Sequence, residues 1–165
     1  MDLRTRIAVI GLGSDSRRDD GVGRAVVDAL RERAADRPLP PVVGLATCNG
    51  DPARLVGLWH DADLAVVVTC AHAYPGEPGR VVRREFGAQG LALPLRGEPY
   101  DPVLDEAVEL SRTLGRLPGR LVVYAVQGAD PSVGTGLSPT LAAMVGSLAD
   151  RVQREVVSGW APVVP

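Results

Sequence analysis

The sequence predicts an α/β fold in which a mostly parallel sheet carries helices on both faces. Apolar stretches of strand length alternate along the chain with amphipathic stretches of helix length. Residues 5–10, 64–70 and 121–126 are almost wholly apolar, which is typical of strands buried on both faces. Strands that alternate with helices pair in parallel, because each helix carries the chain back across the sheet.

The individual strands are apolar runs bounded by turn residues. Residues 5–10 end at a glycine turn, and residues 42–47 follow a proline-rich segment. Residues 64–70 form the most apolar run. Residues 80–85 follow a further glycine turn and alternate as an exposed strand does, and residues 121–126 form the last buried strand.

The helices are predicted by helical spacing and by cap signals. In residues 20–34, apolar side chains recur at helical spacing, with charged side chains on the other side. Three later helices begin at an Asp-Pro or Ser-Pro pair, because Asp and Ser are good N-caps and Pro suits the first helical position. These pairs are Asp51-Pro52, which opens a short helix, Asp101-Pro102, which opens a helix to about Leu114, and Ser138-Pro139, which opens a helix to about Val157.

Length and composition bound the function. The chain of 165 residues fits one domain, which we assign to residues 1–158, followed by a flexible Pro-rich tail at 159–165. A formal net charge of −2 gives no reason to expect a nucleic acid as partner. The longest apolar run is far short of the roughly 20 residues that cross a bilayer, and no secretory signal is recognisable. We therefore expect a cytoplasmic protein without membrane insertion.

The most informative segment joins the first strand to the first helix. Gly11-Leu12-Gly13-Ser14 forms a glycine turn, and Asp19-Asp20-Gly21-Val22-Gly23 then brings two adjacent carboxylates to the helix start. In an open α/β sheet, ligands bind beyond the carboxyl ends of the strands. One Asp can cap the helix while the other faces this crevice, where a carboxylate suits nickel or zinc.

The same glycines allow an alternative, a small-ligand or nucleotide site. A dinucleotide fingerprint needs a third small residue, where Ser16 stands here, and a short phosphate-gripping turn. The connection from Gly13 to Asp20 is long for such a turn, and two carboxylates near a helix start would repel a pyrophosphate. These features disfavour the nucleotide interpretation without removing it.

The glycine turn and the acidic pair resemble the opening of the hydrogenase maturation proteases, in which Asn stands in place of Ser14. Gly136-Leu137-Ser138-Pro139-Thr140, followed by an Ala/Val/Leu-rich helix, is similar to a second segment of that family. The two matches have the right order and cover roughly residues 5–157. The resemblance implies a three-layer α/β/α sandwich with a mostly parallel five-stranded sheet.

The resemblance also implies a function. These endopeptidases trim the C-terminal extension of the large subunit of nickel-iron hydrogenases, and they are thought to recognise nickel already present in that precursor. The family's first acid corresponds to Asp20, which we expect to be the catalytic and nickel-contacting residue. We expect Asp19, Gly11 and Gly13 to bind substrate, and no cofactor beyond the nickel of the substrate.

The other two nickel-contacting positions of the family differ in this chain. Thr69 stands where the resemblance implies an Asp at the end of the third strand, and Tyr100 stands where it implies a His. A neutral Thr or Tyr hydroxyl is a poor ligand for a divalent metal. A non-catalytic relative that binds a precursor or acts as a maturation scaffold is therefore an alternative to the endopeptidase.

Cysteine and histidine provide one way to rebuild such a site. Cys70 and His72 share one face of an extended chain just beyond Thr69, and Cys48 ends the neighbouring strand. Together with Asp20 these side chains would form a soft metal site. The competing interpretation is that both cysteines only fill the core, since Cys is among the residues most often buried.

Overall fold

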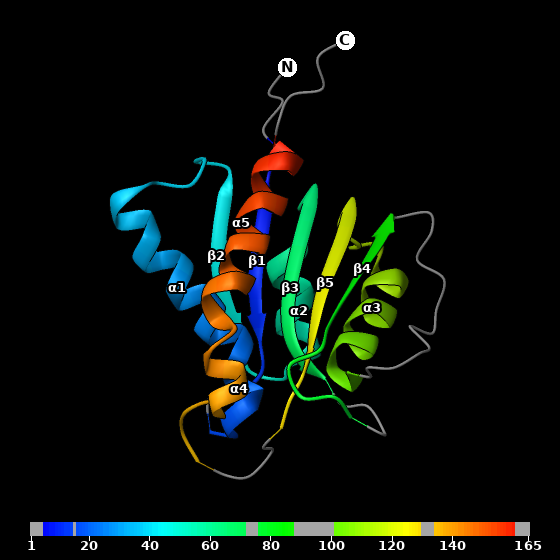
Figure 1. Cartoon of the computed structure of the whole chain (residues 1–165). Helices are drawn as coiled ribbons and strands as arrows, with labels where there is room; N and C mark the ends of the chain where they lie inside the picture. Colours follow the sequence, from blue (N-terminus) through cyan, green and yellow to red (C-terminus); the bar gives the residue numbers. More distant parts are fainter. Residues whose placement is uncertain (1–4, 15, 72–75, 88–100, 130–133, 161–165) are drawn as a thin grey trace.

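The computed structural model describes residues 5–14, 16–71, 76–87, 101–129 and 134–160. A five-stranded sheet lies at its centre, in the order β2-β1-β3-β5-β4 (Figure 1). All neighbouring strands pair in parallel except β4, which pairs antiparallel with β5. The elements are β1 (Ile7–Leu12), a 3-10 turn η1 (Arg18–Gly21), α1 (Val22–Asp36), β2 (Val43–Cys48), α2 (Pro52–Trp59), β3 (Leu64–Ala71), β4 (Val81–Gly87), α3 (Pro102–Leu114), β5 (Arg120–Gln127), α4 (Pro139–Ala142) and α5 (Val145–Trp160).

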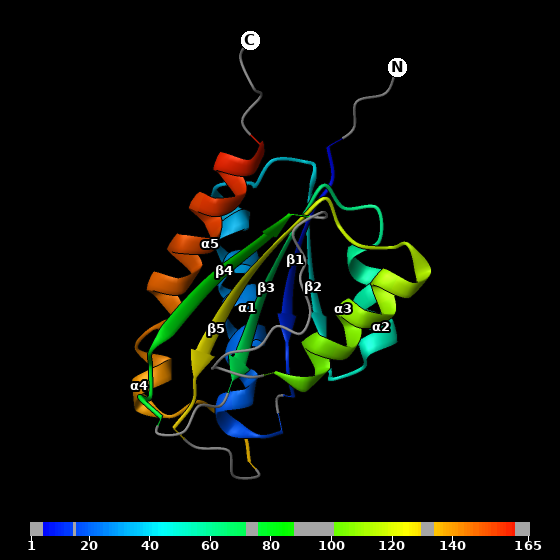
Figure 2. The ribbon, with the colours of Figure 1, turned by 90° about the vertical axis from the view of Figure 1, so that its right-hand side faces the viewer.

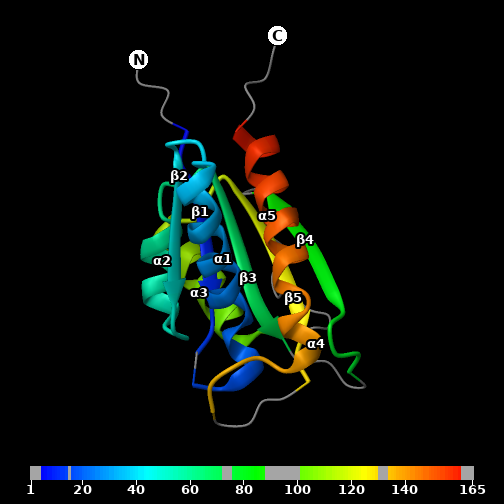
Figure 3. The same cartoon turned by 60° about the vertical axis from the view of Figure 1, so that its left-hand side comes forward.

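Two helical layers enclose the sheet, which confirms the predicted α/β/α sandwich. Figure 2 shows α1 and α5 on one face and α2 and α3 on the other. Figure 3 shows the first of these faces, with α1 and α5 over the strands. Each face has its own buried cluster: Trp59 anchors the one under α2 and α3, and Leu30 and Leu148 belong to the one under α1 and α5. Among the helices described, none combines the length and apolarity of a membrane span.

The predicted elements are all present, with two differences. The predicted last helix is divided into α4 and α5, and α5 continues to Trp160. The predicted tail therefore begins in a helix at residues 159–160, while its remainder, residues 161–165, lies outside the described residues. At the other end, α1 begins at Val22, because residues Arg18–Gly21 form a separate 3-10 turn.

The glycines of the first turn allow backbones to pack in direct contact. A Cβ on Gly11 would lie 2.4 Å from the carbonyl oxygen of Gly23, and one on Gly23 would lie 2.2 Å from the carbonyl oxygen of Val68. A Cβ on Gly13 would lie 2.1 Å from the carbonyl oxygen of Asp20. The start of α1 therefore rests against β1 and β3 with no side chain between them. The glycine spacing needs no bound phosphate to explain it.

Candidate functional site

A cavity of about 450 Å³ lies beyond the carboxyl ends of β1, β2 and β3, beside the start of α3. These strand ends lie together because Leu12 pairs with both Cys48 and Thr69 in the sheet register. This is the edge at which open α/β sheets bind ligands. The cavity is lined by Leu12, Gly13, Ser14, Asp20, Asn49, Gly50, Thr69, Cys70, Asp101, Pro102 and Val103.

Asp20 lies in this cavity, as its sequence position predicts. Its side chain is half-buried, and its Oδ2 accepts a hydrogen bond of 2.8 Å from the backbone N–H of Ser14. Its own backbone N–H donates to the carbonyl oxygen of Arg17 at 2.7 Å, which closes the 3-10 turn. The glycine turn thus holds one carboxylate oxygen of Asp20.

A second carboxylate lines the cavity, that of Asp101, which the sequence interpretation treated only as a helix cap. Its Oδ1 does cap α3, accepting from the backbone N–H groups of Val103 at 3.0 Å and Leu104 at 3.2 Å. Its Oδ2 accepts a hydrogen bond from the hydroxyl of Thr69. One carboxylate therefore serves both the helix start and the end of β3.

The environment of Asp101 makes its carboxylate easier to protonate than that of an ordinary Asp side chain. Burial raises the pKa of Asp101, and the nearby charge of Asp20 raises it further. The hydrogen bonds from Thr69 and from the two capping N–H groups act in the opposite direction without reversing the shift. Asp101 consequently holds a proton at a higher pH than an ordinary Asp side chain does.

The hydroxyl of Thr69 joins Asp101 to the end of β3. Thr69 is buried on β3 between Leu12 of β1 and Ala125 of β5, and it shares its sheet face with Val67 in the cluster under α2 and α3. Its hydroxyl therefore meets the start of α3. The sequence predicted that a carboxylate is lost at this strand end, whereas the structure has the carboxylate of Asp101 hydrogen-bonded there. Tyr100, the other substituted position, lies outside the described residues.

Asp19 differs from its neighbour Asp20 in being 1% exposed. Its Oδ2 accepts from the backbone N–H of Ala129 at 2.7 Å, and its Oδ1 accepts from the backbone N–H of Ser138 at 2.7 Å. It does not line the cavity as described, and it makes no side-chain cap on α1. The prediction that one Asp of the pair caps α1 is therefore wrong. Asp19 instead accepts hydrogen bonds from backbone N–H groups near the other end of the chain.

The two cysteines lie in different clusters. Cys48 packs under α2 and α3, whereas Cys70 packs under α1 and α5 and only Cys70 lines the cavity. Burial, followed by the charges of Asp20, Asp19 and Asp101, raises the pKa of Cys70 to about 12, so its thiol stays protonated. Burial also raises the pKa of Cys48. The described residues contain no group of three His, Cys, Asp or Glu side chains able to hold a metal, and His72 lies outside them.

The two glycines of the first turn differ in access to the cavity. Gly13 lines it, whereas Gly11 is buried within β1, against the start of α1. The predicted contact with a substrate is thus open to Gly13, and the described structure gives Gly11 a packing role.

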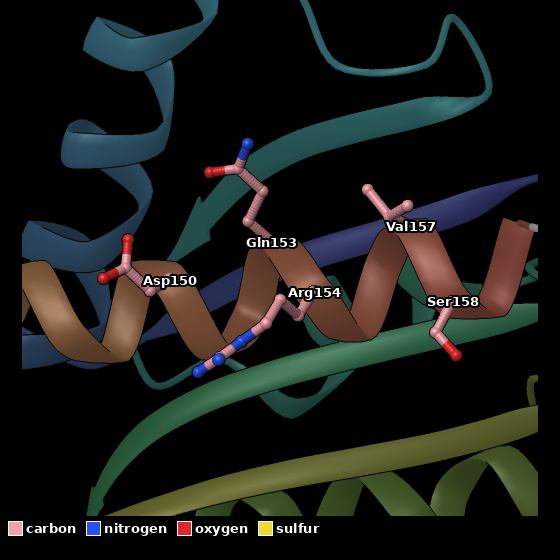
Figure 4. Close-up of a pocket in the computed structure, with 5 residues that line it drawn as sticks. All are labelled: Asp150, Gln153, Arg154, Val157 and Ser158. Atoms are coloured by element: carbon pink, nitrogen blue, oxygen red, sulfur yellow. The ribbon is translucent and has the colours of Figure 1, made fainter.

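A further hollow of about 530 Å³ runs along α5, at the side chains of Asp150, Gln153, Arg154, Val157 and Ser158 (Figure 4). All five side chains come from successive turns of this one helix. None of the predicted site residues lies there, so the cavity at the strand ends remains the candidate site.

No protein-family model and no curated protein matches the sequence. Solved structures do match the fold. The hydrogenase-maturating endopeptidase HybD from Escherichia coli aligns with a TM-score of 0.76 at 22% identity, over 94% of each chain. The [NiFe] hydrogenase maturation protease HycI from Thermococcus kodakarensis aligns with a TM-score of 0.62 at 23% identity, over 93% of each chain.

A third match is a hydrogenase 2 maturation peptidase from a Thaumarchaeota archaeon, with a TM-score of 0.65 at 21% identity, over 92% of this chain and 97% of that one. The chain has the fold of the hydrogenase maturation endopeptidases. This agrees with the resemblance that the sequence motifs indicate, and the low identity marks the chain as divergent from these proteins.

Proposed function

We propose that this protein is a cytoplasmic endopeptidase that removes the C-terminal extension of a nickel-loaded hydrogenase large-subunit precursor. Two observations support the proposal together: the fold matches hydrogenase maturation endopeptidases along nearly the whole chain, and its strand-end cavity holds two carboxylates. The second observation carries most of the weight, because a fold by itself does not determine an activity.

In this proposal Asp20 and Asp101 contact the nickel of the substrate. Carboxylates are suitable ligands for divalent nickel, and two of them attract a cation more strongly than one. Thr69 is then a positioning residue, because its hydroxyl holds the Oδ2 of Asp101 at the end of β3. Asp101 thereby replaces the nickel-contacting Asp that the resembled family has at the end of the third strand, where Thr69 stands in this chain.

The role of the protein's residues is to recognise the metal-loaded end of the precursor and to hold it at the cavity. Nickel bound to the substrate would supply a Lewis acid for polarising the carbonyl group of the peptide bond. Water adds to this carbonyl carbon, the carbon–nitrogen bond breaks, and the leaving amine takes up a proton.

The experiment is intact-mass analysis of a nickel-loaded large-subunit precursor from the same cell, incubated with and without this protein. Loss of a C-terminal fragment with the wild type, and not with Asp20→Asn, would support the endopeptidase. Capture of the precursor without any change of mass would favour the scaffold alternative. Stabilisation by a dinucleotide, with neither capture nor cleavage, would favour the small-ligand alternative.

A further inference from the structure

The acidic turn Arg18–Gly21 is attached to a segment more than a hundred residues later in the chain. The backbone N–H of Gly134 donates to the carbonyl oxygen of Ser16 at 2.9 Å, and the N–H of Arg18 donates to the carbonyl oxygen of Gly134 at 3.1 Å. Asp19 adds its two bonds from Ala129 and Ser138. These hydrogen bonds join the turn, and the neighbouring Ser16, to the described residues between β5 and α4.

Asp19 is the centre of this attachment, because it contacts both ends of that segment. Ala129 lies two residues beyond the end of β5, and Ser138 is the N-cap residue of α4. A buried carboxylate that accepts two backbone N–H groups makes charge-assisted hydrogen bonds, which are stronger than neutral ones. Asp19 thus links the turn Arg18–Gly21 to the end of β5 and to the start of α4.

Tight packing leaves the Asp19 side chain little freedom. A Cβ on Gly128 would lie 3.1 Å from the Cβ of Asp19 and 2.8 Å from the Sγ of Cys70. On the other side of the turn, the carbonyl oxygen of Asp20 lies against Gly13. The turn is therefore held from two sides, by backbone contact with the glycine turn and by the carboxylate of Asp19.

We propose that Asp19 is a positioning residue that fixes the direction of the Asp20 carboxylate by bonding the acidic turn to Ala129 and Ser138. Asp20 is the next residue of the same 3-10 turn, and its Oδ2 must stay in place to accept from the Ser14 N–H. The consequence for cleavage rests on the proposed function, whereas the mechanical coupling does not.

Ser138 offers a matched pair of variants that leave every charge unchanged. Ser138→Pro removes the N–H that Asp19 accepts from, and Ser138 already has φ −58° and ψ 155°, which proline adopts without strain. Ser138→Ala removes the hydroxyl and keeps the N–H. Asp19→Asn is a second, independent variant, because its amide group would face one of the two N–H donors.

The test is hydrogen–deuterium exchange at the backbone amide of Ser14, measured by NMR under conditions where all variants are folded. We expect this amide to exchange about tenfold faster in Ser138→Pro and Asp19→Asn, since losing a bond to a charged group loosens the turn. Ser138→Ala should exchange as the wild type does. Wild-type protection of Ser14 in both Ser138→Pro and Asp19→Asn would overturn the proposal.

Ser111→Ala provides the control for general loss of stability. It removes the buried hydrogen bond of 2.8 Å from the Trp59 indole to Ser111, in the cluster under α2 and α3. When Ser111→Ala and Ser138→Pro are compared at the same free energy of unfolding, Ser111→Ala should keep the Ser14 amide protected. If Ser111→Ala loses as much protection as Ser138→Pro, a specific coupling is contradicted.

With the precursor as substrate, Ser138→Pro should lower kcat/KM about tenfold, because the misdirected Asp20 carboxylate holds the nickel of the substrate less well. If the wild type cleaves no precursor, the proposed function fails, and the exchange at Ser14 still decides the coupling. If the wild type cleaves and Ser138→Pro does so at the same rate, the positioning role is contradicted.

Discussion

The chain begins two helices with the same dipeptide, and the two starts are put to different uses. Asp51-Pro52 opens α2 and Asp101-Pro102 opens α3, each Asp being extended and accepting from the N–H groups two and three residues later. Asp51 is exposed, and its Oδ1 makes both capping bonds. Asp101 makes the same cap, and its second oxygen is bonded to Thr69 beside the cavity.

This difference shows what a local signal contains. The cap is encoded by two neighbouring residues, so the sequence predicts it at both helices. The second use of Asp101 depends on Thr69, which is 32 residues earlier and belongs to a buried strand. Only the packing of α3 against the end of β3 brings the two together. An Asp that already has a local explanation can therefore make a second, non-local contact as well.

Replacing Asp20 by Asn removes the carboxylate that lines the cavity together with that of Asp101. It leaves the N-caps of α2 and α3 intact. We expect cleavage of the precursor to fall by about 1000-fold, because contact with a Lewis-acidic metal contributes several kcal/mol to the reaction. Single-turnover kinetics on the nickel-loaded precursor measures this, with circular dichroism as the check on folding. An active Asp20→Asn variant would show that the cavity carboxylate is not required.

The sequence also predicted that Asp20 lies beyond a strand end, at the cavity. The glycine turn, the acidic pair and the start of α1 are neighbours along the chain, so the position of Asp20 at a strand end follows from local pattern and sheet topology. The opposite use of Asp19 could not be foreseen, because its partners Ala129 and Ser138 come from the other end of the chain. The break between α4 and α5 was missed too, since helical apolar spacing continues across it.

Replacing Asp51 or Asp101 by Ala compares how much each N-cap contributes to the free energy of unfolding. Asp51→Ala should lower the free energy of unfolding by about 1 kcal/mol, the usual value of an N-cap. Asp101→Ala should lower it by about 2 kcal/mol, because it also removes the nearer acceptor of the buried Thr69 hydroxyl and leaves it the Cys70 carbonyl oxygen at 3.4 Å. Urea unfolding of both variants measures the difference, and equal losses would mean that the bond to Thr69 contributes nothing.

Thr69→Val removes the hydroxyl at nearly constant volume and leaves the α3 cap untouched. The freed Oδ2 of Asp101 is then less well directed, so we expect kcat on the precursor to fall about tenfold. Thr47→Val is the control, because it makes the same substitution at a half-buried Thr on β2. A Thr47→Val variant with the same loss as Thr69→Val would argue against a specific role for Thr69.

The pH dependence of stability gives the smallest effect. Because the pKa of Asp101 is raised on folding, the folded chain keeps this proton in a pH range where the unfolded chain has lost it. The contribution of Asp101 to the free energy of unfolding is therefore greatest at acid pH. It declines as pH rises from the ordinary Asp pKa through the raised one. Comparing wild type with Asp101→Asn by urea unfolding across this range should show that decline, and a difference that increases with pH would have the wrong sign.

The most direct test of the central claim, that Asp101 supplies the second carboxylate of the site, compares Asp101→Asn with Asp51→Asn. Asn caps a helix as well as Asp does, so both variants should retain their helix starts and differ only in which carboxylate is lost. Intact-mass analysis of the nickel-loaded precursor should show the C-terminal fragment released by Asp51→Asn at the wild-type rate and retained with Asp101→Asn. Release at the wild-type rate by Asp101→Asn would contradict the claim.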